Sequence, residues 1–386
     1  MRKHRAAIAL SLTALVVAIF GQTSIGNAAV GAVRVTLFAQ NAGKVNNIQA
    51  SRTPTPGKLV PLNARGKLPS SVLPAAARTA PGGYTHTLIV SPDPDPFAAG
   101  RQLLQAVAGI SDAEAANPYL VKIEPGIYDL ASASLSMRPY VDIEGSGEGV
   151  TTIKSALGTG AGTVIGANNS ELRYLTVKNT GEPNQQVVGL FTETTSPRFS
   201  HVTVVASGGS ENYGIHTSNG TPALSYVTAS ASGGGQSFGL VNFNSVITVL
   251  NSTFSASDGL GFNAGYVSTA GGTNRITSST ITASGGAIAI GMRAYNGSHT
   301  LANATVSASG PGETTGIYIG QKASTPTVNI LQSRVSGGTN SIYSIGGALK
   351  VGASQLTGPA GTFDIGTMTC VASFNGAYQP LSQACS

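Results

Sequence analysis

The sequence has little of the residues that most often carry out chemistry. Its 386 residues include no tryptophan, two cysteines, five histidines and 16 acidic residues. Two cysteines need further ligands to form a metal site, and no histidine follows His299, so we expect neither a metal nor a cofactor. Between Leu172 and Gly347, where the sequence is most regular, only five residues are acidic, which argues against the clustered carboxylates of acid–base catalysis.

The only long apolar run lies at the N-terminus. Residues 1–29 begin with basic MRKHR, continue with the apolar AAIALSLTALVVAIF and end with the small residues GNAA, which is the pattern of an export signal. The run is short for a membrane span of roughly 20 residues. We therefore expect cleavage and a secreted or cell-surface protein without a membrane span, with an uncleaved anchor as the alternative. Export also favours a disulfide between Cys370 and Cys385.

Residues 30–83 have no acidic residue and many Pro, Gly and basic residues. Ten of the 22 basic residues precede residue 83, and the remaining 12 are outnumbered by the 16 acidic residues. We interpret 30–83 as a solvated basic linker, although such a tract can also bind an anionic wall polymer, a membrane surface or nucleic acid. Because aromatic residues do not alternate with Lys and Arg there, we expect no nucleic-acid partner.

One segment of this linker, LNARGKLPSSVLP, resembles segments that precede fibre domains in phage tail proteins. That resemblance implies a homotrimer.

A short motif recurs seven times from Leu172 to about Gly347. It reads LRYLTVKNT, FSHVTVVAS, LSYVTASAS, VLNSTFSAS, ITSSTITAS, LANATVSAS and VNILQSRVS. Successive motifs start 25 or 27 residues apart, and a fixed period of this length is typical of a solenoid. Apolar or small residues alternate with polar ones, which is the period of a β-strand. The fifth residue of the first six motifs should form one outward column: Thr176, Thr203, Thr228, Thr253, Thr280 and Thr305.

Each unit also contains a second strand. After a Gly-rich stretch the chain resumes with Gly and an apolar residue, as in Gly189-Leu190 and Gly214-Ile215, and we expect the second strand to begin there. Coils of two or three strands would stack roughly 4.8 Å apart and bury their apolar residues in a continuous column. The repeats therefore predict an all-β fold, a parallel β-helix of about 25–27 residues per coil, over residues 84–386.

The residues before the repeats predict further strands and a helix. THTLIVSP, YLVKIEPGIYDL and PYVDIEGSGEGVTTIKS favour strands, and PFAAGRQLLQAVAGI favours a helix with Phe97, Leu103, Leu104 and Val107 on one apolar face. This helix would cover the open end of the stack and protect its strand edges.

This order of elements resembles the N-terminal part of the pectin methylesterases, in the pectate-lyase-like superfamily of right-handed parallel β-helices. The resemblance rests on LIVSP, the short helix, VKIEPGIYDL and VDIEGSGEGVTTI, and covers Thr87 to Ser155. It implies a right-handed β-helix with an N-terminal helical cap. The catalytic pattern of that family includes tryptophan and paired aspartates, and it cannot be carried over to any residue of this chain.

Two acidic residues, one motif and one histidine are weak candidates for catalysis. Glu182 and Glu211 fall in the Gly-rich loops of adjacent coils and could form a carboxylate pair. Gly235–Gly239 matches the G-x-S-x-G pattern of serine hydrolases, but it lacks the strand-turn-helix context of that pattern. His201 occupies a position that holds tyrosine in neighbouring repeats, so packing explains it better than catalysis.

Stronger candidates lie on the second strand. Alternation after each Gly-apolar pair predicts two outward columns, whose aromatic and cationic members are Phe191, His216, Phe243, Arg293, Tyr295 and Tyr318. Aromatic rings with polar groups between them suit sugar rings, although loops or a partner subunit could also cover them. We therefore expect a non-catalytic protein that binds a polysaccharide or cell-envelope glycan. The alternatives are a polysaccharide-active lyase or esterase and a structural stalk or adhesin.

Overall fold

The computed structural model describes residues 44–45, 48–49, 83–320, 325–362 and 366–386. The expected export signal lies outside the described residues. The chain divides into two compact units, Met1–Gly83 and Tyr84–Ser386. In the first unit, β1 (Lys44–Val45) and β2 (Ile48–Gln49) pair antiparallel. Among the described residues, no helix has the length and apolar character needed to span a membrane.

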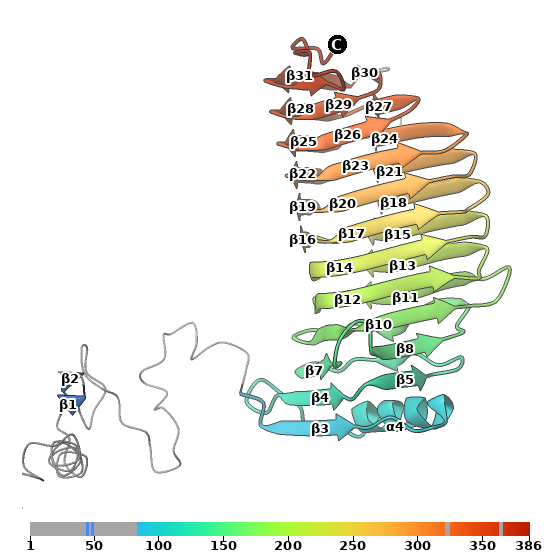
Figure 1. The fold of residues 1–386 in the computed structure, drawn as a ribbon, viewed down its shortest axis with the longest axis vertical. Coiled ribbons are helices and arrows are strands. Elements are labelled where there is room, and N and C mark those ends of the chain that lie inside the picture. Colours follow the sequence, from blue (N-terminus) through green and yellow to red (C-terminus); the bar gives the residue numbers. More distant parts are fainter. Residues whose placement is uncertain (1–43, 46–47, 50–82, 321–324, 363–365) are drawn as a thin grey trace, which may run out of the picture. The chain divides into compact units, whose positions relative to one another are not determined.

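The unit Tyr84–Ser386 is a parallel β-helix, as the repeats predict. Its strands stack coil upon coil along one axis, each joined by hydrogen bonds to the equivalent strand of the next coil (Figure 1). The first coils contain β3 (His86–Val90), α4 (Pro96–Ala108), β4 (Tyr119–Ile123), β5 (Gly126–Asp129), β6 (Leu135–Ser136), β7 (Val141–Glu144), β8 (Thr151–Ser155) and β9 (Thr159–Ile165).

The recurring motif forms a strand with a bend in its middle. The bend residue has a left-handed backbone, with φ of 55° at Tyr174, 53° at His201 and 55° at Tyr226, and from the fourth repeat it splits the strand in two. These strands are β10 (Glu171–Thr180), β12 (Arg198–Ser207), β14 (Ala223–Ser232), β16 (Thr248–Leu250), β17 (Thr253–Ser257), β19 (Thr273–Thr277), β20 (Thr280–Ser284), β22 (Ser298–Ala302), β23 (Thr305–Ser309), β25 (Thr327–Leu331), β26 (Arg334–Gly337), β28 (Ala348–Gly352), β29 (Gln355–Thr357), β31 (Thr367–Val371) and β32 (Phe374–Asn375).

The second strands of the coils form a separate ten-stranded parallel sheet together with β6 and β9. Its other members are β11 (Gln186–Glu193), β13 (Glu211–Ser218), β15 (Gln236–Phe243), β18 (Phe262–Ser268), β21 (Ile288–Ala294), β24 (Glu313–Ile319), β27 (Asn340–Ser344) and β30 (Ala360–Thr362). The expectation that these strands begin at the repeated glycine is wrong, because Gly214 and Gly239 lie inside β13 and β15.

The predicted register is confirmed. Thr176 pairs with Thr203, and the pairing continues through Thr228, Thr253, Thr280 and Thr305. Each of these threonines is at least partly exposed. The alternating positions of the first repeat are fully buried, Leu175, Val177 and Asn179. One column of inward residues therefore runs the length of the stack.

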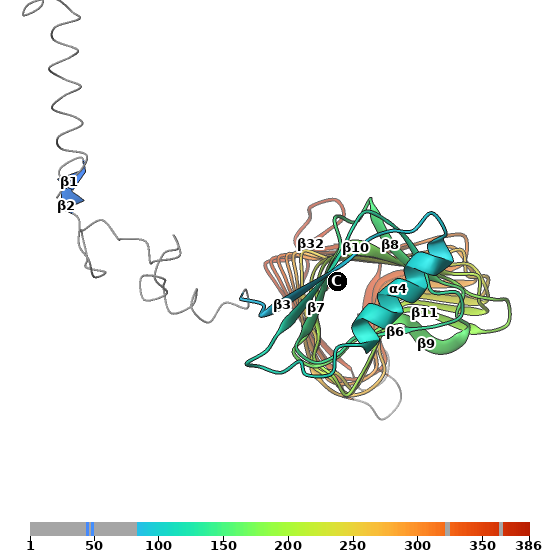
Figure 2. The same ribbon diagram turned by 90° about the horizontal axis from the view of Figure 1, so that it is seen from below.

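The helix α4 covers the N-terminal end of the stack, as predicted (Figure 2). Asp95 caps it by accepting a hydrogen bond from the Phe97 amide at 3.0 Å. Leu103 and Val107 are buried. Phe97 is 48% exposed, so the prediction that it lies on the apolar face of the helix is wrong. Gly100 takes the contact instead: a Cβ there would lie 2.0 Å from the Asp129 carbonyl oxygen, so only glycine allows the helix to approach β5 this closely.

The C-terminal segment closes the last coil. The predicted disulfide between Cys370 and Cys385 is present, and both residues are buried. The Cys370 amide donates to the Gln383 carbonyl at 2.9 Å, and the Leu381 amide donates to Ser373 at 2.8 Å. The chain end is thus fixed to β31 by a covalent bond and by backbone hydrogen bonds.

Candidate ligand-binding face

The outer face of the second sheet carries the column predicted from the repeats. Each member pairs with its counterpart on the next coil, in the order Phe191, His216, Val241, Val267, Arg293 and Tyr318. The structure adds Tyr343, which was not predicted and pairs with Tyr318. The residues that precede this column by one position, such as Leu190, Ile215 and Leu240, are fully buried. The alternation used to place these side chains outside the coil is therefore correct.

Three more rings lie on the same face, before the repeated glycine, and the sequence reasoning missed them. The ring centroid of Tyr213 lies 4.9 Å from that of Phe238, which lies 5.7 Å from Phe262. Tyr213 also lies 5.8 Å from His216, whose ring meets Phe191 edge-on at 5.4 Å. Arg293 contacts the rings of Phe262, Tyr295 and Tyr318, and Tyr318 stacks on Tyr343. We call the whole set of rings the aromatic strip: Phe191, Tyr213, His216, Phe238, Phe262, Tyr295, Tyr318 and Tyr343.

The strip includes a small apolar cluster that is separate from the main core. Phe238, Val241 and Val267 are 8%, 8% and 5% exposed, and Phe262 and Tyr295 pack against them. The rings thus partly cover one another. Phe243, in the neighbouring column with Glu193 and Ser218, is 48% exposed and is the most accessible ring of the predicted set.

Burial controls the titration of this face. Burial lowers the pKa of His216, against a smaller opposing effect of Glu193, so the imidazole is held neutral. Burial also raises the pKa of Tyr213, whose hydroxyl donates to Glu211 at 2.7 Å. The strip is therefore mostly uncharged, with Arg293 as the cation of the predicted set.

The weak catalytic candidates lie in different environments. The Glu211 carboxylate accepts hydrogen bonds from Gln186 and Tyr213, whereas Glu182 lies exposed in the loop after β10. Ser237 of the G-x-S-x-G pattern is fully buried, and its hydroxyl donates to the Gly233 carbonyl at 2.9 Å. A nucleophile must reach its substrate, so this serine has a structural role.

The expectation for His201 is confirmed by its ring contacts. Its ring stacks between Tyr174 and Tyr226, with centroids 4.9 and 4.6 Å away. Packing at the bend of the strand accounts for this histidine.

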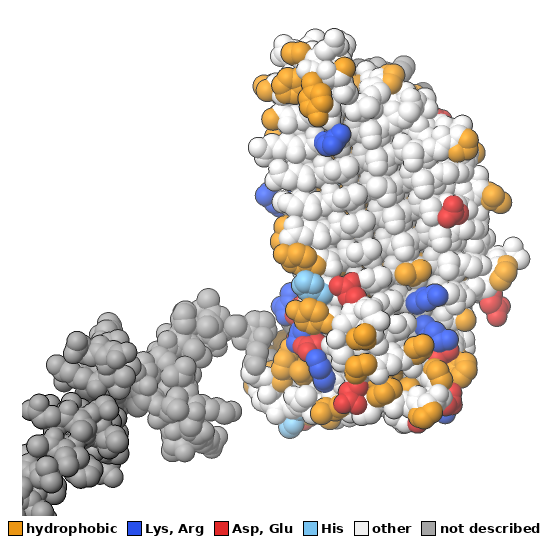
Figure 3. All heavy atoms as spheres, viewed as in Figure 1, with side chains coloured by type: hydrophobic (Ala, Val, Ile, Leu, Met, Phe, Trp, Pro, Cys, Tyr) orange, Lys and Arg blue, Asp and Glu red, His pale blue; other side chains and the backbone are white. Residues whose placement is uncertain are grey.

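A charged network on the first coils was also missed. Arg173 lies 3.4 Å from Asp142, 2.7 Å from Glu144 and 3.2 Å from Glu171, and the Tyr84 hydroxyl donates to Asp142 at 2.6 Å. Figure 3 shows charged side chains gathered over these coils, while the face above them is mostly uncharged. Strand alternation places Asp142 and Glu144 on one face of β7, and Glu171 and Arg173 on one face of β10, but it does not show that the two strands are neighbours.

Each charge in this network has a partner of opposite sign. Lys122 forms an ion pair with Glu144, and Arg198 lies 3.3 Å from Glu171. Burial alone would raise the pKa of Glu144, but hydrogen bonds from Lys122 and Arg173 lower it. Because each carboxylate is paired with a cation, the network is better suited to holding the first coils together than to acid–base chemistry.

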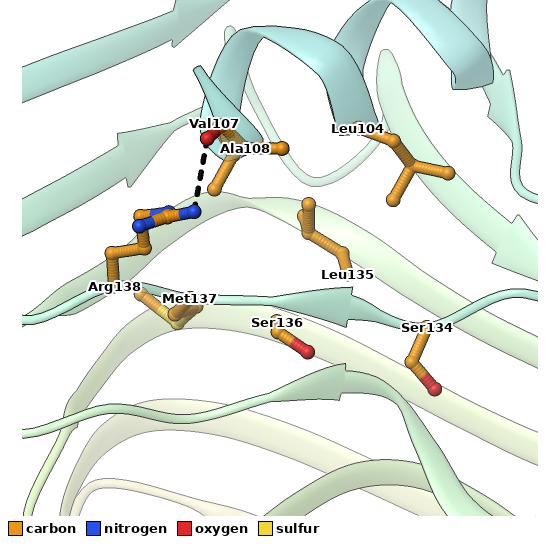
Figure 4. Close-up of a pocket in the computed structure, with 8 residues that line it drawn as sticks. All are labelled: Leu104, Val107, Ala108, Ser134, Leu135, Ser136, Met137 and Arg138. Carbon is orange, nitrogen blue, oxygen red and sulfur yellow. Dashed lines mark hydrogen bonds between the residues drawn. The ribbon is translucent and has the colours of Figure 1, made fainter. Parts of the chain in front are cut away.

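A pocket of about 420 Å³ lies between α4 and the edge strand β6 (Figure 4). Apolar side chains of α4 and β6 form most of its wall, among them Leu104, Val107 and Leu135. Arg138, the charged residue among the described lining residues, donates to the Ala108 carbonyl at the end of α4 at 2.9 Å. This arginine therefore caps the helix.

No family model and no curated protein matches the chain. Similar solved structures include the A-module of mannuronan C-5 epimerase AlgE4 from Azotobacter vinelandii, 14% identical over 76% of this chain and 98% of that one, with a TM-score of 0.37. The pectin methylesterase PemA from Erwinia chrysanthemi is 12% identical over 78% and 92%, with a TM-score of 0.37. The Dettilon tailspike protein is 13% identical over 77% and 68%, with a TM-score of 0.44. These likenesses concern the parallel β-helix fold, which the strand pairings establish.

Proposed function

We propose that the protein binds a polysaccharide or a cell-envelope glycan on the aromatic strip and on Phe243 beside it, without catalysis. The observation that carries this proposal is the series of rings on the outer face of a sheet from β11 to β27, in which Arg293 lies between Phe262 and Tyr318. Rings of this kind present apolar faces that stack on sugars while their polar edges stay hydrated. A long solenoid also offers an extended surface, which suits a polymer.

The distribution of acidic residues supports binding without catalysis. The outer face of the second sheet carries Glu193, Glu211 and Glu313 on β11, β13 and β24. Glu211 is engaged by Gln186 and Tyr213. An acid–base mechanism needs two groups that reach one bond of the substrate, and these glutamates belong to different positions along the face.

The test is a glycan array with the purified protein, read for binding and for the release of reducing or unsaturated ends. Stacking is worth about 1–3 kcal/mol per ring by analogy with base stacking, so Phe243→Ala should weaken binding roughly ten- to a hundredfold. Tyr378→Ala is the matched control, because this ring is 73% exposed near the C-terminus, away from the strip. Equal affinities for wild type and Phe243→Ala would refute the proposed face, and product release would favour a lyase or esterase.

The second candidate function is a structural stalk. It is favoured by the outer face of β14, β17, β20 and β23, where every outward position after the bend is Ser or Thr, as in Thr228, Ser230 and Ser232. Such a face is hydrated and uncharged and needs no ligand. A protein that binds nothing on the array would support this alternative.

We also propose that the chain is exported and acts outside the cytoplasm. The pattern of residues 1–29 and the disulfide Cys370–Cys385 support this location, because disulfides persist in oxidising compartments. A homotrimer is a further proposal, and sedimentation of the mature protein would reveal it as a threefold mass.

A further inference from the structure

Arg293 lies at the centre of the aromatic strip. It belongs to the outward column of β21, between Val267 and Tyr318 on the neighbouring coils. Its guanidinium carbon lies 4.4 Å from the ring centroid of Tyr295, 5.0 Å from Tyr318 and 5.3 Å from Phe262. Three cation–π contacts therefore hold this side chain in place, which fixes the direction of its N–H groups.

The guanidinium lacks an anionic partner among the residues that the structure describes. The Arg293 Nε atom is buried and forms no hydrogen bond. In contrast, Arg173 on the first coils contacts three carboxylates. Ring faces attract a cation, but they do not accept hydrogen bonds in the plane of the guanidinium, so its terminal N–H groups remain without an acceptor among the described residues.

The acidic residues of the same face lie far from Arg293. Glu211 is three coils away, roughly 14 Å at the spacing of paired strands. Glu313 is on the next coil, but it pairs with Ile288, five residues before Arg293 and roughly 16 Å along the strand. Both values are separations between backbones, and among the described residues no carboxylate forms an ion pair with Arg293.

We propose that Arg293 recognises a negatively charged group on the glycan: a carboxylate, sulfate or phosphate substituent. This inference rests on the proposed function and adds the chemical class of the ligand. An oxyanion can accept two parallel hydrogen bonds from one guanidinium edge, while the adjacent Tyr295 and Tyr318 rings contact the sugar that carries it. Arg293 thus determines specificity for acidic over neutral glycans.

The experiment compares pairs of oligosaccharides that differ only in charge. The pairs are a polyuronate oligomer with its methyl ester, a sulfated galactan with the unsulfated form, and a phosphorylated mannan with the plain mannan. Binding to the full chain is measured at two salt concentrations for wild type, Arg293→Gln and Arg293→Lys. Arg198→Gln, an exposed arginine on β12, is the control for loss of a positive charge.

The wild type should bind one charged member about ten- to a hundredfold more tightly than its neutral partner, and this preference should fall with salt. Arg293→Gln should lose the preference and its salt dependence but keep binding of the neutral member, with Arg293→Lys between the two. The pair that gives the preference identifies the anionic group.

Equal binding of charged and neutral members by the wild type, weakened for both by Phe243→Ala, would overturn the role of Arg293 and leave glycan binding standing. An unchanged preference in Arg293→Gln would also overturn it. Absence of binding to every probe would overturn both proposals. Because Arg293→Gln removes cation–π contacts, its thermal unfolding is compared with that of the wild type and of Arg293→Lys, which keeps the charge. Equal unfolding temperatures would show that a lost preference is not due to unfolding.

Discussion

His299 is a buried histidine whose hydrogen bonds determine which ring nitrogen carries the proton. Its Nε2 donates to the Asn296 carbonyl at 2.9 Å, so the neutral ring accepts at Nδ1 from the Asn274 amide at 3.3 Å. The orientation of the Asn274 side-chain amide is fixed, because its oxygen accepts hydrogen bonds from the Asn242 side chain at 3.0 Å and from the Ile247 backbone amide at 3.1 Å. Burial lowers the pKa of His299 to about 4, against an ordinary value of 6.5.

This lowered pKa predicts destabilisation by acid. Above pH 6.5 the ring is neutral in both folded and unfolded states, whereas below it the unfolded chain binds a proton that the folded chain does not. The contribution to the free energy of unfolding should therefore fall by about 3 kcal/mol between pH 6.5 and 4. Urea unfolding of wild type and His299→Gln over this range measures the effect, and identical pH dependence in both proteins would contradict it.

Arg173 and Arg198 differ in burial and in number of partners. The Arg173 side chain is 15% exposed and contacts three carboxylates, while Arg198 is 47% exposed and contacts Glu171. Arg173→Ala leaves the Asp142 carboxylate buried without its cation, so the free energy of unfolding should fall by about 3 kcal/mol. Arg198→Ala should cost less than about 1 kcal/mol. The two variants are compared by their urea midpoints at constant m-value. An equal loss in free energy of unfolding would mean that burial does not determine how much each arginine stabilises the network.

At the scale of strands, a ladder of glycines brings the second sheet close to the first. A Cβ on Gly239 would lie 2.6 Å from the Gly265 carbonyl oxygen and 2.8 Å from the Ser255 amide nitrogen. Comparable contacts with backbone or core atoms recur at the other members of the ladder, Gly189, Gly214, Gly265, Gly291 and Gly316. The repeated glycine is therefore a packing requirement.

Gly239→Ala should lower the free energy of unfolding by about 2–3 kcal/mol, because backbone atoms cannot move aside as a flexible side chain would. Gly235→Ala is the matched control: its Cβ would meet only the Ser210 carbonyl oxygen, at 3.4 Å, an ordinary contact. Thermal or urea unfolding distinguishes the two variants. A loss of equal size in both would show that backbone entropy, and not the close approach of the sheets, determines the effect.

The repeats also determined which parts of the strands could be predicted. The repeat alignment placed Thr203 and His216 in the correct outward columns. It succeeded there because the repeat period fixes the register of parallel strands. Tyr213, Phe238 and Phe262 precede that glycine, in a Gly-rich stretch interpreted as a loop, and were missed.

The charged network depends on spatial neighbours that no repeat aligns. Arg173 belongs to the first repeat, whereas Asp142 and Glu144 come from β7, before the repeats begin. Its hydroxyl partner Tyr84 lies 89 residues away in sequence. Residues of such different origin come together only when the coils stack, so the sequence pattern alone could not identify the set.

For the whole β-helix, stability depends on closing both ends of the stack. Each coil contacts only its neighbours, so an open terminal coil would expose core residues and strand edges. The N-terminal end is covered by α4. The C-terminal end has no helix in the described residues, and Leu381 and Cys385 pack against the main core there instead.

The disulfide should therefore control the last coils in particular. Its cysteines are 15 residues apart, and closing a loop of this size contributes about 3 kcal/mol in the chain-entropy model. In the double variant Cys370→Ala and Cys385→Ala, hydrogen exchange should speed up in β28, β29, β31 and β32. Amides of β10 and β12 should keep their protection, because in a solenoid the loss of one end weakens chiefly the adjacent coils. Uniform loss of protection along the stack would instead mean that the β-helix unfolds as a single cooperative unit.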